Sequence, residues 1–180
     1  GDTHGNANST ICFNGFTGYA LSISKSPNLT VRKCRFLGFG STAAHPSVNP
    51  ASFTGCDNLL IDGCEIEGGN FGFWTANSGD TVQTVTVKDS RIAHIYQTGA
   101  YSSQRAAIHL EGKVKPFILG CTIEEIANGS AVPTAIYSLA TSEHVISNCV
   151  IRSCSTTGGN ALGHVYIRSV ESSYLRVCFY

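Results

Sequence analysis

Six residues carry side chains that suit sugar recognition and proton transfer. Flat rings with polar tips fit the alternating CH faces and hydroxyl groups of sugars, and an acid and a guanidinium beside them can hydrogen-bond to those hydroxyls. Glu111 and His109 are the candidate catalytic residues, whereas the other four are candidates for substrate binding. The four candidate binding residues are Trp74, Tyr137, Tyr166 and Arg168.

A repeated phrase explains how residues so distant in the chain could meet. The phrase Asn28-Leu-Thr-Val-Arg-Lys-Cys34-Arg-Phe36 returns, altered, at intervals of 20 to 31 residues. Such a period indicates a repeat architecture. Altered copies begin at Asn58, Thr84, Pro116 and His144, with a degenerate copy at Thr10 and an interrupted one at Tyr174.

Each repeat predicts three short strands. Leu29 and Val31 alternate with Thr30 and Arg32, which indicates a strand with one buried face. An earlier strand precedes this one by a nearly constant distance, and a third follows the cysteine position. An antiparallel sandwich would not keep this register through five units. The sequence therefore predicts an all-β, right-handed parallel β-helix of about six to seven rungs.

The same register places the candidate residues in one external file. Between the buried residues of each first strand lies one outward position. Successive rungs place Ser22, Ser52, Trp74, His109, Tyr137 and Tyr166 there, and Ala76, Glu111, Leu139 and Arg168 at the next outward position. We expect the rings to be exposed and to bind sugar. Packing against another subunit and simple cross-rung stacking remain alternatives.

The phrase beginning at Asn28 resembles the rung repeat of the right-handed parallel β-helix family of pectate-lyase type, over about residues 10 to 180. In that family a polar residue, often Asn, stacks inside the turn after the second strand. Asn14 and Ser90 keep this polar character, whereas four cysteines depart from it. The resemblance implies the fold and leaves the activity open.

Eight cysteines would suggest disulfides in a secreted protein. Four of them occupy one repeat position, so we favour a buried row of reduced thiols over disulfides. These four are Cys34, Cys64, Cys121 and Cys149.

Charged residues on the later strands alternate in sign from rung to rung. Arg32, Asp62 and Lys88 form one predicted ladder. Arg35, Glu65 and Arg91 form a second. We interpret both as structural ion-pair ladders, each exposed pair contributing roughly 0–1 kcal/mol.

Glu111 could act in glycoside hydrolysis only together with a second carboxyl group. Glycoside hydrolysis needs two carboxyl groups about 5 to 9.5 Å apart, and only Asp80, Glu143 and Glu171, in or near turns, could approach Glu111. Lyases of this fold use clustered calcium ligands, which the sequence lacks, and His109 with Glu111 supplies too few ligands for a metal. We expect no metal and no cofactor. The remaining histidines, His4, His45, His94, His144 and His164, are expected in loops or on the surface.

Composition narrows the partners. The formal net charge is zero and 13% of the residues are charged, so we expect no nucleic-acid partner. No apolar run reaches the length of a membrane span, so we expect no membrane association. The chain has no methionine and ends within an apolar strand. We therefore expect residues 1–180 to form a single β-helix domain, a fragment of a longer chain.

Three functions fit these features. The first is a carbohydrate-engaging β-helix from a bacteriophage tailspike or a similar surface fibre. Such proteins are typically trimers on the virion tail or another extracellular surface, and they bind and often cleave bacterial polysaccharide. The second is a stand-alone polysaccharide hydrolase, lyase or epimerase. The third is a noncatalytic adhesin or structural solenoid.

The longer repeats predict loops that project from the solenoid, where binding and catalytic residues usually lie. We expect these loops at residues 38–50, 97–105, 127–133 and 155–160.

Overall fold

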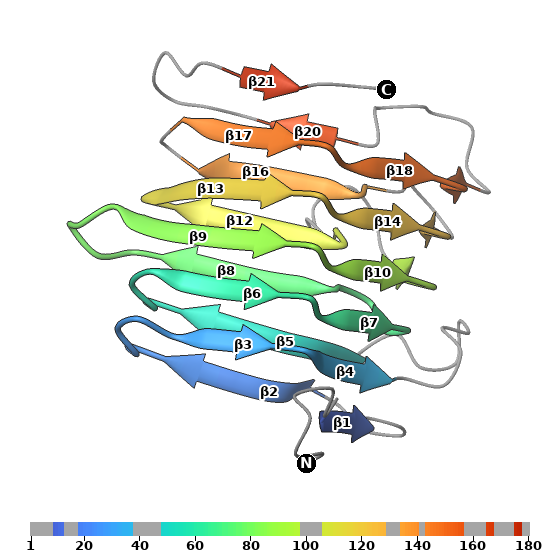
Figure 1. Ribbon diagram of the computed structural model, residues 1–180, viewed down its shortest axis with the longest axis horizontal. Helices are drawn as coiled ribbons and strands as arrows, with labels where there is room; N and C mark the ends of the chain where they lie inside the picture. Colours follow the sequence, from blue (N-terminus) through green and yellow to red (C-terminus); the bar gives the residue numbers. More distant parts are fainter. Residues whose placement is uncertain are drawn as a thin grey trace.

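The chain folds into a parallel β-solenoid, shown as a ribbon in Figure 1. The computed structural model describes residues 9–12, 18–37, 48–97, 106–128, 134–140, 143–156, 165–167 and 175–177. Within these ranges every strand pairing is parallel, and three sheets contain six strands each. The predicted fold class is therefore confirmed. None of the described segments is a helix with the length and apolar character needed to cross a bilayer.

Four sheets are built from strands that recur once per rung. The first sheet contains β2 (Gly18–Ser24), β5 (Val48–Thr54), β8 (Phe73–Asn77), β12 (Ile108–Gly112), β16 (Ile136–Ala140) and β20 (Val165–Ile167). The second sheet contains β3 (Thr30–Arg32), β6 (Leu59–Asp62), β9 (Gln83–Lys88), β13 (Val114–Leu119), β17 (His144–Ser147) and β21 (Leu175–Val177).

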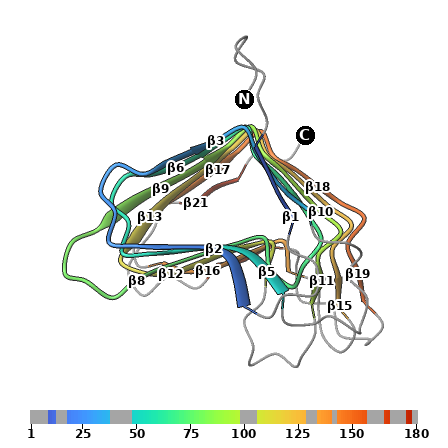
Figure 2. The same ribbon diagram turned by 90° about the horizontal axis from the view of Figure 1, so that it is seen from below.

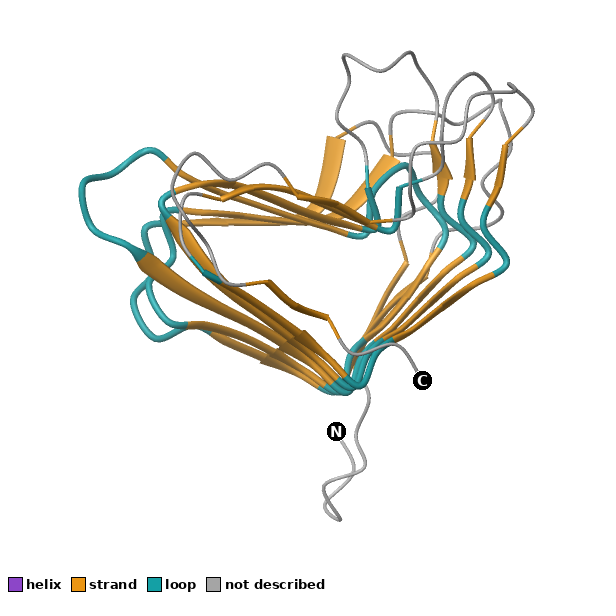
Figure 3. Ribbon diagram, turned by 90° about the horizontal axis from the view of Figure 1, so that it is seen from above, coloured by secondary structure: helices purple, strands orange, loops and turns teal. Residues whose placement is uncertain are grey.

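The third sheet contains β1 (Ser9–Cys12), β4 (Cys34–Leu37), β7 (Glu65–Glu67), β10 (Arg91–Ala93), β14 (Thr122–Glu124) and β18 (Val150–Arg152). A short fourth sheet contains β11 (Tyr96–Gln97), β15 (Ala127–Asn128) and β19 (Ser155–Thr156). Seen along the stack, the three long sheets form the sides of a triangle (Figures 2 and 3). Each residue therefore has one equivalent directly above it and one below.

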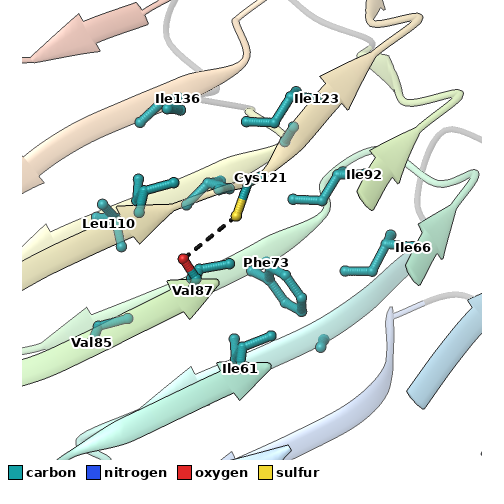
Figure 4. Close-up of a cluster of buried hydrophobic side chains, with 14 of the residues drawn as sticks. Ile61, Ile66, Phe73, Val85, Val87, Ile92, Leu110, Cys121, Ile123 and Ile136 are labelled. Atoms are coloured by element: carbon teal, nitrogen blue, oxygen red, sulfur yellow. Dashed lines mark hydrogen bonds between the residues drawn. The ribbon is translucent and has the colours of Figure 1, made fainter. Parts of the chain in front are cut away.

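The core is made of apolar side chains stacked in columns along the solenoid (Figure 4). Ile66, Ile92 and Ile123 are paired across consecutive strands of the third sheet, and each is fully buried. Phe53 and Phe73 stack in the first sheet with ring centroids 6.4 Å apart. The alternation of buried and outward residues predicted for the strands is confirmed in β8 and β9.

One corner, between the second and third sheets, has the same backbone conformation in five rungs. Its residues have φ angles of 50 to 62°, a left-handed conformation that glycine and asparagine adopt most easily. The five are Lys33, Gly63, Asp89, Gly120 and Asn148. We call the column formed by the next residues the thiol column: Cys34, Cys64, Ser90, Cys121 and Cys149. All four cysteines in it are free, as predicted.

Ion pairs run along the outside of the second and third sheets. Asp62 pairs with Arg32 below it at 2.9 Å and with Lys88 above it at 3.5 Å. In the third sheet Glu65 pairs with both Arg35 and Arg91. Both predicted ladders are confirmed. The second continues further than expected, because Glu124 bridges Arg91 and Arg152.

The interior also holds polar groups, which corrects the expectation for one histidine. His144 was expected in a loop or on the surface, but it lies in β17 with 1% of its surface exposed. Its Nε2 lies 2.6 Å from the hydroxyl of Ser138, across the core in β16. A buried histidine is tolerated here because this hydroxyl satisfies one of its ring nitrogens.

Candidate functional site

The outer face of the first sheet brings four of the proposed site residues into one row. Trp74 pairs with His109, His109 with Tyr137, and Tyr137 with Tyr166. We call these four residues the aromatic file. Their predicted alignment across β8, β12, β16 and β20 is confirmed by this register, while their role in binding stays a prediction.

The rings of the aromatic file contact one another continuously. Tyr137 and Tyr166 stack almost in parallel, with centroids 4.9 Å apart and an interplanar angle of 9°. His109 is tilted against Tyr137 at 5.1 Å and meets Trp74 edge-on at 6.3 Å. The result is an unbroken strip of ring surface that crosses four rungs.

A fifth ring, Tyr19, extends the strip and was not predicted. It stacks on Trp74 with centroids 5.6 Å apart and an interplanar angle of 24°. Neighbouring residues Ala20 and Leu21 both pack against the core, so the alternation that would have assigned Tyr19 a direction breaks there. Figure 2 shows β2 and β5 turning away from the plane of the first sheet at this end. Burial at this contact raises the pKa of the Tyr19 hydroxyl.

The expected exposure of His109 is wrong. Only 4% of its surface is accessible, although it lies outside the apolar core. The reason is size, because the imidazole is smaller than the rings on either side of it. Phe71 also contacts it edge-on at 6.3 Å. Trp74, Tyr137 and Tyr166 are half-buried.

Glu111 lies one outward position beyond His109 on β12. Its side chain is 31% exposed, and its Oε1 lies 3.4 Å from Nε2 of His109. The structure thus brings the two proposed catalytic groups together, as the sequence suggested. In strand register Glu111 is flanked by Ala76 and Leu139, which supply neither acid nor base.

The proposed second acids have partners elsewhere. Asp80 pairs with Lys113 at 3.4 Å, and Glu143 pairs with Lys115 at 3.3 Å. Glu171 and Arg168 lie outside the described residues, as do residues 38–47, 98–105, 129–133 and 157–160 of the expected loops. Within the described ranges no three His, Cys, Asp or Glu side chains gather in a way that could hold a metal.

Trp74 also contributes a polar atom that the strip leaves unused. Its Nε1 is buried and has no hydrogen-bond partner among the residues that the structure describes. A buried donor without an acceptor costs roughly 1–3 kcal/mol.

Parallel pairing, a triangular section and one strand per sheet in every rung define a parallel β-helix. The sequence matches the family described as "Right handed beta helix region" over residues 51–178. The chain belongs to this family. No curated protein matches the chain, and no solved structure matches it.

Proposed function

We propose that the outer face of the first sheet binds carbohydrate, with the aromatic file and Tyr19 as the platform. The observation that carries this proposal is the continuous strip of ring contacts on a rigid sheet. Sugar rings stack on aromatic faces through their CH groups, and the tyrosine hydroxyls and the Glu111 carboxylate can hydrogen-bond to sugar hydroxyls. A strip crossing several rungs suits an extended polysaccharide better than a single monosaccharide.

The setting that best fits is a surface fibre of the bacteriophage tailspike kind, assembled as a homotrimer on a virion tail or another extracellular surface. This part of the proposal rests on the resemblance of the rung repeat to pectate-lyase-type β-helices and on the ring strip. The ligand would then be a bacterial surface polysaccharide.

If the chain also cleaves the polysaccharide, Glu111 is the acid and His109 the group that orients it, since 3.4 Å separates them. Hydrolysis would need a second carboxylate about 5 to 9.5 Å from Glu111. A stand-alone hydrolase, lyase or epimerase is therefore the second candidate function. A noncatalytic adhesin is the third, and it needs only the rings.

Binding can be tested by screening the protein on an array of bacterial polysaccharides and measuring the affinity for any hit by calorimetry. Loss of one stacking ring should weaken binding about tenfold, which corresponds to about 1.4 kcal/mol of binding free energy. Trp74→Ala and Tyr137→Ala remove rings of the platform. Phe117→Ala is the matched control, because Phe117 is a half-buried aromatic of the second sheet.

Three outcomes separate the candidates. Weaker binding for Trp74→Ala and Tyr137→Ala, with Phe117→Ala unchanged, supports the proposal. Dissociation of an oligomer by the same two variants in sedimentation would instead assign the strip to a subunit interface. Cleavage of a bound polysaccharide that disappears in Glu111→Gln would establish the catalytic function, and unchanged cleavage would remove Glu111 from it.

A further inference from the structure

Two tyrosines of the aromatic file lie in direct ring contact. Tyr137 of β16 pairs with Tyr166 of β20 in strand register. Their rings stack with centroids 4.9 Å apart and an interplanar angle of 9°. Among the residues that the structure describes, no second pair of tyrosine rings is in contact, since Tyr19 stacks on Trp74. Register and stacking together hold two phenol groups side by side.

The shared register gives the two phenol groups the same position on the first sheet. Neighbouring parallel strands lie about 4.8 Å apart, close to the 4.9 Å between the ring centroids. The two side chains therefore run nearly parallel, and the ring carbons beside each hydroxyl lie next to their counterparts. Both side chains are half-buried and lie outside the apolar core. An oxidant that acts by electron transfer can therefore oxidise the pair without unfolding the solenoid.

We propose that Tyr137 and Tyr166 form an oxidative cross-linking site, at which a one-electron oxidant joins the two rings as dityrosine. The co-reactant class is a one-electron oxidant, such as the high-valent haem of a peroxidase or a ruthenium(III) complex. The product is a carbon–carbon bond that ties β16 to β20. This modification goes beyond sugar binding and does not depend on it.

The bond requires movement of the side chains only. Stacked rings must turn their edges toward each other, and the torsion that turns a tyrosine ring has a broad energy minimum. The ring tips must then lean together from parallel side chains, which leaves the strand pairing in place. All three residues of β20 are half-buried, whereas β16 alternates with fully buried positions. Tyr166 is therefore on the less tightly enclosed strand and is the ring expected to move.

The chemistry balances as a loss of two electrons and two protons. The oxidant removes one electron from each ring, and each hydroxyl proton passes to solvent, which leaves two phenoxyl radicals. Their unpaired electrons are shared with the ring carbons beside the hydroxyl-bearing carbon. One such carbon from each ring forms the new bond, and each then releases its hydrogen as a proton while its oxygen takes one up. Two equivalents of ruthenium(III) are reduced to ruthenium(II).

Substitution by phenylalanine should leave the fold intact. Tyr137→Phe and Tyr166→Phe keep a ring for stacking and remove the hydroxyl group that radical formation requires. Tyr19→Phe is the matched control, because Tyr19 is a half-buried tyrosine of the same strip whose stacking partner is Trp74.

The test oxidises the full chain with tris(bipyridyl)ruthenium(III) and maps the products by mass spectrometry. Trypsin cleavage after Lys113, Arg152 and Arg168 gives two peptides, 114–152 and 153–168, that each contain a single tyrosine. The wild type should yield these peptides linked and two hydrogen atoms lighter, from a chain that runs as a monomer on a denaturing gel. Tyr137→Phe and Tyr166→Phe should lose the linked pair, and Tyr19→Phe should keep it.

The folded register should matter as much as the residues. Oxidation of the wild type in urea should lower the yield of the linked pair about tenfold, because the rings are then no longer held in position. N-acetyltyrosine amide in the same tube reports that the oxidant is active, and circular dichroism confirms that the chain without urea stays folded.

Three results would overturn the proposal. The first is coupling of N-acetyltyrosine amide with no linked pair in the folded chain. The second is linkage of the Tyr137 peptide to other tyrosine peptides in equal yield, which would show unselective oxidation. The third is an equal yield of the linked pair with and without urea, which would show that the stacked register does not direct the reaction.

Discussion

Gln97 is fully buried and uses both ends of its side-chain amide on one neighbour. Its Nε2 donates to the Thr134 carbonyl at 2.9 Å, and its Oε1 accepts from the Thr134 backbone N–H at 3.1 Å. The amide thus supplies the two hydrogen bonds that a neighbouring strand would otherwise provide. It fixes Thr134 just before β16, which carries Tyr137.

We expect Gln97→Met to lower the free energy of unfolding by about 1–3 kcal/mol, because it removes two hydrogen bonds to the Thr134 backbone while keeping the side-chain volume. Urea denaturation followed by circular dichroism measures this. Gln83→Met is the matched control, since Gln83 is also buried but, within the described part of the chain, its Oε1 has no hydrogen-bond partner. Equal losses for both variants would show that the Thr134 bonds contribute nothing.

At the scale of elements, the third sheet is stabilised on its outer face by an ion-pair ladder that is longer than the one on the second sheet. Glu124 is the best placed member, with its side chain 10% exposed between Arg91 and Arg152. Hydrogen bonds from Arg152 and Arg91 lower the pKa of its carboxyl group. A carboxyl group with a lowered pKa stabilises the fold above its unfolded-state pKa, and this contribution disappears as the pH falls through its folded-state pKa.

Glu124→Gln should therefore destabilise the protein by about 1 kcal/mol at pH 7, a value reduced by the exposure of both arginines. As the pH falls below the ordinary glutamate pKa of about 4.3, the difference between the variant and the wild type should shrink, because protonation removes the charge that the two arginines bind. Urea unfolding between pH 3 and 7 measures both effects. Asp57→Asn, at an exposed turn residue, is the control. A constant difference across this pH range would contradict the assignment.

Element-scale features were the most predictable from the sequence. Period-two alternation was enough to align Trp74, His109 and Tyr137, because direction in a strand depends only on parity. The same logic failed at Tyr19, where the strand bends. It also did not reveal that His109 is covered, because coverage depends on the sizes and rotamers of rings in other rungs. Glu124 was missed as a ladder member because its pairing follows from side-chain reach rather than from a repeat position.

The whole molecule is a stack in which each rung contacts the rungs above and below it. A destabilising substitution in a central rung should therefore also lower the stability of the two neighbouring rungs. Ile92 tests this, because it is fully buried between Ile66 and Ile123. We expect Ile92→Ala to lower the free energy of unfolding by about 2–5 kcal/mol.

Hydrogen exchange should show the loss spreading to both β7 and β14, and not only to β10. Val150→Ala is the control, because Val150 is 49% exposed and its truncation should leave stability nearly unchanged. Faster exchange confined to β10 would mean that the rungs open independently.

The shared corner conformation has a consequence for how such a chain can change its length. Asp89 and Gly120 have nearly the same φ angle, 50° and 62°, and each is followed by a member of the thiol column. A gene lacking the codons for residues 90–120 would join Asp89 directly to Cys121, with an equivalent corner on both sides of the junction. Recombination between such positions can add or remove one whole rung without creating a new turn, so the solenoid can change its length at this corner.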